Sequence, residues 1–195
     1  MTIPNLLTLG RIFLTPLLAW LLLSEWMRAA FFVFFFAGLT DALDGLIARV
    51  FAQKSRLGSF IDPLADKLLL VTSFVTLWKI GQIPFWLVFI TVGRDVFILC
   101  GSLVLLLCQV RFEIKPLASS KLTTLFELGT VFALLGRSFL ELSGWIYSAL
   151  FLMTAGFSIL SGGQYFTKGM SLLKKKWEAG STKPEAESGN RTNTQ

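Results

Sequence analysis

Six apolar runs of about twenty residues or more follow one another along this 195-residue chain, and they constrain its fold more than any other feature. A helix of that length is long enough to cross the hydrocarbon of a bilayer. The composition, 54% hydrophobic and 15% charged, excludes a disordered chain and argues against a soluble globule. The sequence therefore predicts an all-α polytopic membrane protein with six transmembrane helices. We expect the spans at residues 5–24, 29–50, 58–79, 83–108, 117–137 and 142–167.

The basic residues between these spans gather on one side of the membrane. The second and fourth connections and the C-terminal tail are rich in Lys and Arg, whereas the opposite side has only Arg28, Lys79 and Arg137. The positive-inside rule then places both termini in the cytoplasm. Because Pro4 and Pro16 interrupt the first run, we expect it to begin as a short interfacial segment.

One membrane domain, residues 1–177, and a disordered polar tail, residues 178–195, account for the whole sequence. The first apolar run has no basic segment before it and no cleavage site after it, so we expect no signal peptide and a place in a bacterial inner membrane. Cys100 and Cys108 would lie about 12 Å apart on one helix, which argues against a disulfide.

Two classes of function are disfavoured by the residue types. The chain has no histidine, so a histidine base, ligand or triad is excluded. The net charge of +6 comes from residues between the spans and in the tail, which indicates topology and contact with anionic lipid or phosphate. We therefore expect no binding of nucleic acid.

Four of the five aspartates fall in one 26-residue window, at Asp41, Asp44, Asp62 and Asp66. Each pair is three or four residues apart and so shares one face of its helix. A short connection makes the two helices antiparallel neighbours, and the four carboxylates can then converge in a polar cavity open to the cytoplasm. Carboxylates in a span are costly unless a positive charge compensates them. One or two Mg²⁺ or Mn²⁺ ions would do so, and such sites usually serve phosphate chemistry.

Small residues and an arginine stand beside these aspartates. Gly45, Ala48 and Gly58 permit close packing of helices, and they equally permit close approach of a phosphorylated ligand. Arg49 is well placed for a diphosphate. Acidic and basic residues in membrane helices can also simply pair, and that interpretation stays open for Arg94 and its neighbour Asp95.

The spacing of the window resembles the signature of the CDP-alcohol phosphatidyltransferase family. Every fixed position of that signature is matched, and both spacers have family length, in Asp41-x2-Asp44-Gly45-x2-Ala48-Arg49-x8-Gly58-x3-Asp62-x3-Asp66. Residues 3–11 and 62–67 are similar to those of the phosphatidylglycerophosphate synthase and CDP-diacylglycerol-dependent cardiolipin synthase branches. The resemblance covers nearly the whole chain and implies transfer of a phosphatidyl group from CDP-diacylglycerol to an alcohol, with release of CMP.

The resemblance also implies a role for each residue of the window. Asp41, Asp44 and Asp62 would hold two divalent ions, with Asp66 at the edge of the second ion. Asp66 would act as the base that deprotonates the acceptor hydroxyl, which then attacks the β-phosphorus. Contacts with CDP-diacylglycerol would come from Asn5, Gly45, Ala48, Arg49, Ser55 and Gly58.

The acceptor alcohol is marked less clearly. A phosphorylated alcohol such as glycerol 3-phosphate needs cations opposite the metal ions, and the candidates are Arg94, Lys121, Arg11 and Arg111. Lys121 could instead snorkel to the interface, and Arg111 could be a topology charge. We expect glycerol 3-phosphate, the commoner acceptor for a chain of this size. Phosphatidylglycerol is the alternative, because the Gly-Arg-Asp sequence around Arg94 is similar to the Ser-Arg-Asp of cardiolipin synthases.

Two other classes of function remain open. The carboxylates could line an ion path, which predicts transport of Mg²⁺ without turnover of a CDP-lipid. A catalytically silent scaffold predicts that Asp66→Asn alters stability alone. The Phe-rich runs 31–36 and 85–97 would either face lipid or form the interface of a homodimer.

Overall fold

The computed structural model describes residues 3–50, 58–107, 118–139 and 142–181, and it confirms the all-α class. A short 3-10 helix, η1, joins the last two helices. The helices are α1 (Ile3–Leu23), α2 (Met27–Val50), α3 (Gly58–Lys79), α4 (Phe85–Leu107), α5 (Ala118–Leu135), η1 (Gly136–Ser138) and α6 (Gly144–Ser181). Each α-helix begins within two residues of a predicted span, and only α6 runs well past the end of its span, beyond the predicted start of the polar tail at Glu178.

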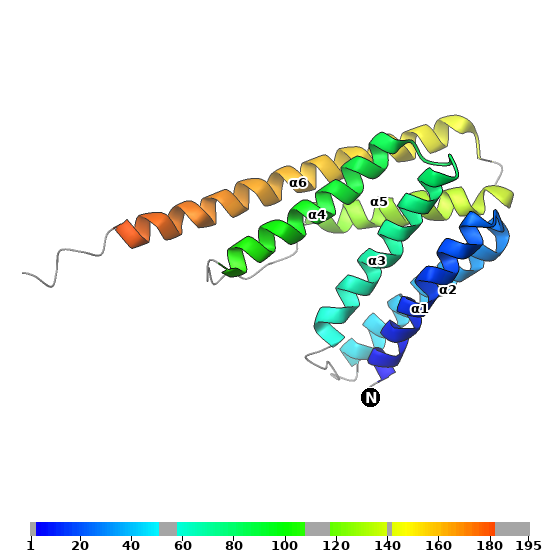
Figure 1. Cartoon of the computed structure of the whole chain (residues 1–195), viewed down its shortest axis with the longest axis horizontal. Helices are drawn as coiled ribbons and strands as arrows, with labels where there is room; N and C mark the ends of the chain where they lie inside the picture. The colour runs from blue at the N-terminus through cyan, green and yellow to red at the C-terminus, as the bar shows by residue number, and fades with distance from the viewer. Residues whose placement is uncertain (1–2, 51–57, 108–117, 140–141, 182–195) are drawn as a thin grey trace, which may run out of the picture.

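The helices form two arms that meet at one end and diverge from it (Figure 1). In the first arm α1 packs against α2 and α3, and in the second arm α6 packs against α4 and α5. Contacts of α2 with α5, and of α3 with α4 and α5, join the arms. We call the end that carries the connections 24–26 and 80–84 and the 3-10 helix η1 the closed end, and the opposite end the open end.

The apolar core lies toward the closed end. Leu22, Leu77, Leu87 and Leu135 are fully buried there, one from each of α1, α3, α4 and α5. Between helices in a membrane such contacts stabilise through close packing rather than through exclusion of water. This packing fixes the positions of both arms where they meet.

Two turns at the closed end terminate their helices in the same way. The N–H of Glu25 donates to the carbonyl of Leu22 (3.0 Å) and that of Gly81 to the carbonyl of Trp78 (2.8 Å). In each turn the next N–H reaches the carbonyl one residue further back, at 2.9 Å. This is the Schellman motif, whose first non-helical residue is left-handed. Accordingly φ is +76° at Gly81 and +60° at Glu25.

Exposed tryptophans mark the closed end. Tryptophan favours the interface between membrane and water, where its ring and its N–H find different surroundings. Such a ring of side chains fits a closed end that lies at one face of a bilayer. The exposed tryptophans there are Trp20, Trp26, Trp78, Trp86 and Trp145.

Two helices of the described residues are long and apolar enough to cross a membrane, over Phe85–Leu103 and Gly144–Ser171. Shorter apolar helical stretches cover Leu9–Leu23 and Met27–Thr40. The number of six spans and the cytoplasmic side of both termini stay predictions.

Three further predictions concern the first helix, the cysteines and the C-terminal tail. The helix α1 is continuous through Pro16, and the interfacial place of its first residues stays a prediction. Cys100 carries a free thiol, whereas Cys108 lies outside the described residues. The part of the predicted tail after Ser181 also lies outside them.

Candidate active site

The aspartate window lies at the open ends of α2 and α3. Asp41 and Asp44 belong to the second half of α2, and Asp62 lies near the start of α3. The backbone therefore places them toward the same end of the first arm, while their convergence on one site stays a prediction. Ten of the predicted site residues lie outside those whose side chains or surroundings the structure describes. They are Asn5, Asp41, Asp44, Gly45, Ala48, Arg49, Ser55, Gly58, Asp62 and Arg111.

Asp66 is the one aspartate of this window whose side chain is described. Its Oδ1 accepts a hydrogen bond from Nη1 of Arg11, which α1 presents to α3. The Arg11 side chain is 2% exposed, whereas that of Asp66 is 40% exposed. A charge-assisted hydrogen bond of this kind orients the carboxylate. The fold thus brings the predicted base next to one predicted acceptor residue and leaves the base accessible.

Lys67 directs its side chain to the second arm. Its Nζ donates to Oδ2 of Asp95 (2.7 Å) and lies 3.7 Å from Oε2 of Glu127. Both carboxylates are buried, on α4 and α5 respectively, while Lys67 is partly exposed. Adjacent residues of α3 therefore contact different arms, because Asp66 contacts α1 and Lys67 contacts α4 and α5.

Arg94 connects the three helices of the second arm through hydrogen bonds. Its Nη1 donates to Oδ1 of Asp95 (2.6 Å), and its Nη2 donates to the hydroxyls of Ser120 (2.9 Å) and Ser161 (2.6 Å). The side chain is buried, so these bonds also satisfy polar groups shielded from water. The pairing of Arg94 with Asp95 is thus present, and the role of Arg94 in binding an acceptor stays a prediction.

The described part of the site contains equal numbers of positively and negatively charged side chains in contact. Three cations, Arg11, Lys67 and Arg94, face the three anions Asp66, Asp95 and Glu127. The remaining predicted acceptor cation of the described set, Lys121, is exposed on α5 and makes no hydrogen bond or ion pair to another described residue. The described interior therefore offers no surplus of positive charge.

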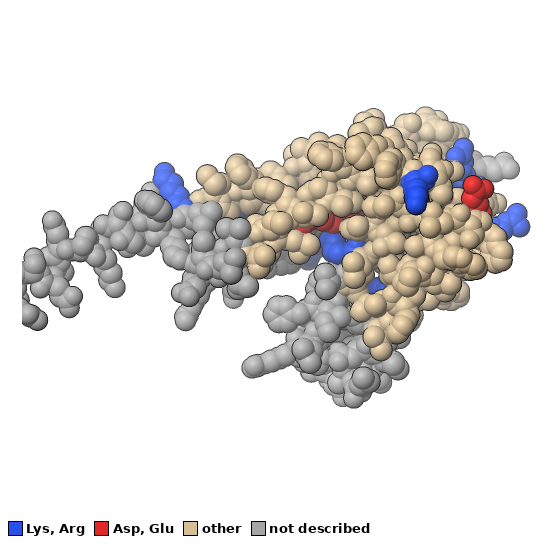
Figure 2. All heavy atoms as spheres, in the orientation of Figure 1, with Lys and Arg blue, Asp and Glu red and all other residues tan. Residues whose placement is uncertain are grey.

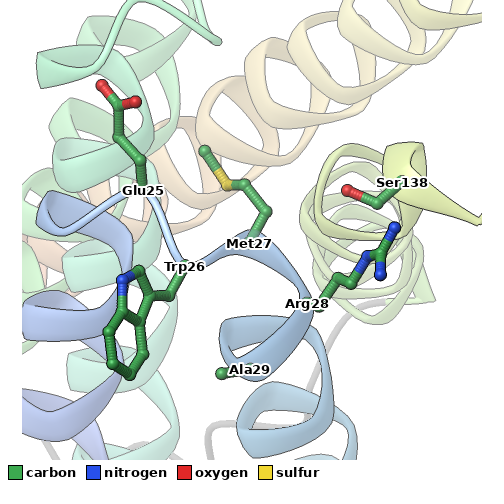
Figure 3. A pocket seen from close by; sticks show the side chains of 6 residues that line it. All are labelled: Glu25, Trp26, Met27, Arg28, Ala29 and Ser138. Atoms are coloured by element: carbon green, nitrogen blue, oxygen red, sulfur yellow. The ribbon is translucent and has the colours of Figure 1, made fainter.

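Figure 2 shows acidic and basic atoms side by side in the angle between the arms, where α3 faces α4. The surrounding surface is largely uncharged, as expected for helices in contact with lipid. A cavity of about 460 Å³ lies elsewhere, at the closed end, where Glu25, Trp26, Arg28 and Ser138 contribute to its lining (Figure 3). The predicted site residues do not line this cavity.

Sequence reasoning did not single out Glu127 or the contacts of Lys67. Glu127 is the one acidic residue of α5, and a carboxylate in the middle of a largely apolar helix was a usable signal. Lys67 was noticed as part of a family-like segment, but no spacing rule indicated that it reaches α4 and α5.

Comparison with known proteins agrees with this geometry. The model of the CDP-alcohol phosphatidyltransferase family matches residues 1–160, which contain the whole aspartate window. Over 190 residues the chain is 36% identical to the cardiolipin synthase (CMP-forming) of Rattus norvegicus, covering 89% of this chain and 63% of that protein. It is 31% identical over 194 residues to the CDP-diacylglycerol–glycerol-3-phosphate 3-phosphatidyltransferase of Bacillus subtilis, covering 88% of this chain and 97% of the relative.

The chain belongs to the CDP-alcohol phosphatidyltransferase family. The Homo sapiens cardiolipin synthase is similar at 35% identity, and again the chain spans 63% of that protein's length. Relatives named for two different activities thus match the same chain at comparable identity, which leaves the acceptor to be argued from the site.

Proposed function

We propose that the protein transfers a phosphatidyl group from CDP-diacylglycerol to the hydroxyl of a glycerol-based alcohol and releases CMP. The observation that carries this proposal is the accessible Asp66 carboxylate, which the buried Arg11 holds at the open end inside the matched family region. A silent scaffold has no need of an accessible carboxylate oriented in this way, and release of CMP distinguishes the transfer from an ion path.

In the proposed reaction Asp66 accepts the proton of the attacking hydroxyl. The oxygen of that hydroxyl forms a bond to the β-phosphorus of CDP-diacylglycerol, while the bond from this phosphorus to the bridging oxygen breaks. CMP departs with the electron pair of that bond. An alcohol has a pKa far above neutral, so a positioned base accelerates the attack by about 10²- to 10⁴-fold. Arg11 orients the base through its hydrogen bond to Oδ1.

Four carboxylates would hold the divalent ions that we propose for this site, Mg²⁺ or Mn²⁺. The donor set of Asp41, Asp44, Asp62 and Asp66 consists of oxygen ligands, which both ions prefer. Bound ions would neutralise the charge of the diphosphate and of the departing CMP. Contacts to the CDP group are proposed for Asn5, Gly45, Ala48, Arg49, Ser55 and Gly58.

The divergence of the arms fits a lipid substrate. The acyl chains can stay in the bilayer while the diphosphate reaches the polar residues between α1, α3 and α4. We propose that the open end faces the cytoplasm of a bacterium, because the helix ends that precede and follow the basic connections lie there, while the other end carries exposed tryptophans.

For the acceptor, we propose phosphatidylglycerol, with cardiolipin as the product. Arg94 is engaged by Asp95, Ser120 and Ser161, and Lys121 lies exposed, so neither provides a free buried cation for the dianionic phosphate of glycerol 3-phosphate. The similarity to cardiolipin synthases over 89% of the chain supports the same choice. This reverses the order expected from sequence.

Glycerol 3-phosphate stays the second candidate. The relative that supports it is similar along nearly its whole length, 97%, whereas the chain spans 63% of the cardiolipin synthases. If it is the acceptor, we expect its phosphate to be bound by the exposed Lys121 or by Arg111, which lies outside the described residues.

A paired assay separates the two acceptors. Purified protein receives CDP-diacylglycerol and Mn²⁺ with either labelled phosphatidylglycerol or labelled glycerol 3-phosphate, and both CMP and labelled lipid are measured. We expect CMP and cardiolipin from phosphatidylglycerol. Label entering lipid from glycerol 3-phosphate alone would establish the second candidate, and no CMP with either alcohol would overturn the proposed transfer.

A further inference from the structure

Glu127 is a buried carboxylate that the proposed chemistry does not use. It is 2% exposed, and neither of its oxygens accepts a hydrogen bond from a described residue. Its charge partner is Lys67, whose Nζ lies 3.7 Å from Oε2. Burying an ion pair costs desolvation energy, and a pair of apolar side chains would usually join two helices at least as stably. Stability alone therefore gives no reason for these charges.

The position of Lys67 supplies a reason. It follows Asp66 directly, on the segment of α3 that also carries Asp62. Its ammonium group is held from two sides, by Asp95 of α4 at 2.7 Å and by Glu127 of α5. Asp95 is itself held by Arg94, which is bonded to Ser120 and Ser161. The first half of α3 is thus connected through Lys67 to α4 and α5, and through Asp95 and Arg94 also to α6.

Catalysis is sensitive to small displacements of a base or ligand. A shift of about 1 Å can lower a rate about 100-fold even when the altered residue touches no reactant. Because α3 packs mainly against α1, apolar packing fixes this segment less firmly relative to α4 and α5 than relative to the first arm.

We propose that Lys67, held by Asp95 and Glu127, is a positioning residue that sets the place of the Asp62–Asp66 segment relative to the second arm. The residue acts through the segment, and its removal alters the geometry of metal ligands and base rather than the binding of lipid. The kinetic test of this inference rests on the proposed function, whereas the metal-binding test does not depend on it.

The decisive variant is the double substitution Lys67→Met with Glu127→Leu. It removes the cation together with the carboxylate that faces it, so the local charge changes less than in Lys67→Met alone. It also leaves Asp95 paired with Arg94. The double variant and the wild type are compared at equal amounts of folded protein, because the loss of Lys67 as a partner of Asp95 should lower the thermal midpoint.

For this folded double variant we expect kcat to fall at least about tenfold, with KM for CDP-diacylglycerol within about twofold of the wild type. Mn²⁺ titration calorimetry, which needs no turnover, should show an affinity at least about fivefold weaker. Lys67→Arg, which keeps the charge for Asp95 and Glu127, should recover most of kcat and of Mn²⁺ affinity.

A matched control lies in the same arm. Thr130 and Thr154 form a buried hydrogen bond of 2.8 Å between α5 and α6. Their replacement by valine removes a buried polar pair without touching α3, and it should leave kcat and Mn²⁺ affinity unchanged.

The double variant overturns the proposal if its kcat and Mn²⁺ affinity equal those of the wild type, since the ion pair would then be structural alone. Should wild-type protein release no CMP with any acceptor, the proposed function fails, and the Mn²⁺ titrations still decide the role of Lys67. Equal Mn²⁺ affinities for wild type and double variant would reject that role in this case too.

Discussion

The closed and open ends of the molecule are built from different interactions. At the closed end, buried leucines of four helices pack together, and two Schellman turns end α1 and α3. Between this core and the open end, near the middle of the helices, the described interior holds three cations and three anions, with Arg11 paired to Asp66 and with Lys67 and Arg94 paired to Asp95 and Glu127. Apolar packing tolerates a range of side chains of suitable volume, whereas paired buried charges depend on every partner.

This difference assigns separate tasks to the two ends. Changes at the closed end should lower stability and leave the activity of each folded molecule intact. Changes at the open end should lower activity more than stability. The largest effects are therefore expected at the aspartates and the smallest at the turns.

Removal of a proposed metal ligand should have the largest effect. We expect Asp62→Asn to lower CMP release at least about 100-fold and to weaken Mn²⁺ binding, because it removes one ligand charge. Chelation of divalent ions should abolish turnover in the wild type, and added Mn²⁺ should restore it. Glu25→Gln, at the exposed closed-end turn, is the matched acidic control and should change neither quantity. If chelation of divalent ions left the turnover of the wild type unchanged, the proposal that these ions take part in the reaction would be wrong.

A core substitution at the closed end should show the opposite pattern. Leu77→Ala leaves a cavity where Leu77 is fully buried, and we expect the free energy of unfolding to fall by about 2–5 kcal/mol. Leu125→Ala removes the same atoms from an exposed position and should change stability by less than about 0.5 kcal/mol. Unfolding in detergent, followed by circular dichroism, compares the two. A loss of kcat in folded Leu77→Ala would contradict the division between the ends.

The turns offer the smallest test. Gly81→Ala should lower the free energy of unfolding by about 1–2 kcal/mol, because φ is +76° there. A Cβ at this position meets no atom within 4 Å, so the cost is that of the backbone alone. Glu25→Gly, at φ +60°, should raise stability by up to about 1 kcal/mol. If both substitutions changed the free energy of unfolding in the same direction, side-chain contacts rather than the φ angle would determine the stability of these turns.

The helices could be predicted from the sequence because each follows from a local run of apolar residues. The span predicted at 58–79 coincides with α3, and the others begin within two residues of their helices. The extent of α6 could not be predicted from hydropathy, since its polar end, with Lys174 and its neighbours, is a good helix former without being apolar.

The site could be predicted only where its residues form a sequence pattern. The spacing of the aspartates identified the family, which the comparison confirms. The contact of Asp66 with Arg11 and the contacts of Lys67 with Asp95 and Glu127 join residues far apart in the chain. Helical periodicity assigns residues to a face of one helix, and it does not tell which faces of different helices meet.

The most direct test of the account is the rate of CMP release from CDP-diacylglycerol, with phosphatidylglycerol as acceptor, by wild-type protein and by Asp66→Asn at equal amounts of folded protein. We expect the wild type to release CMP and Asp66→Asn to be slower by about 10²- to 10⁴-fold, because asparagine cannot accept the proton of the hydroxyl. Folded Asp66→Asn with the rate of the wild type would contradict the central claim that this carboxylate at the open end performs the transfer.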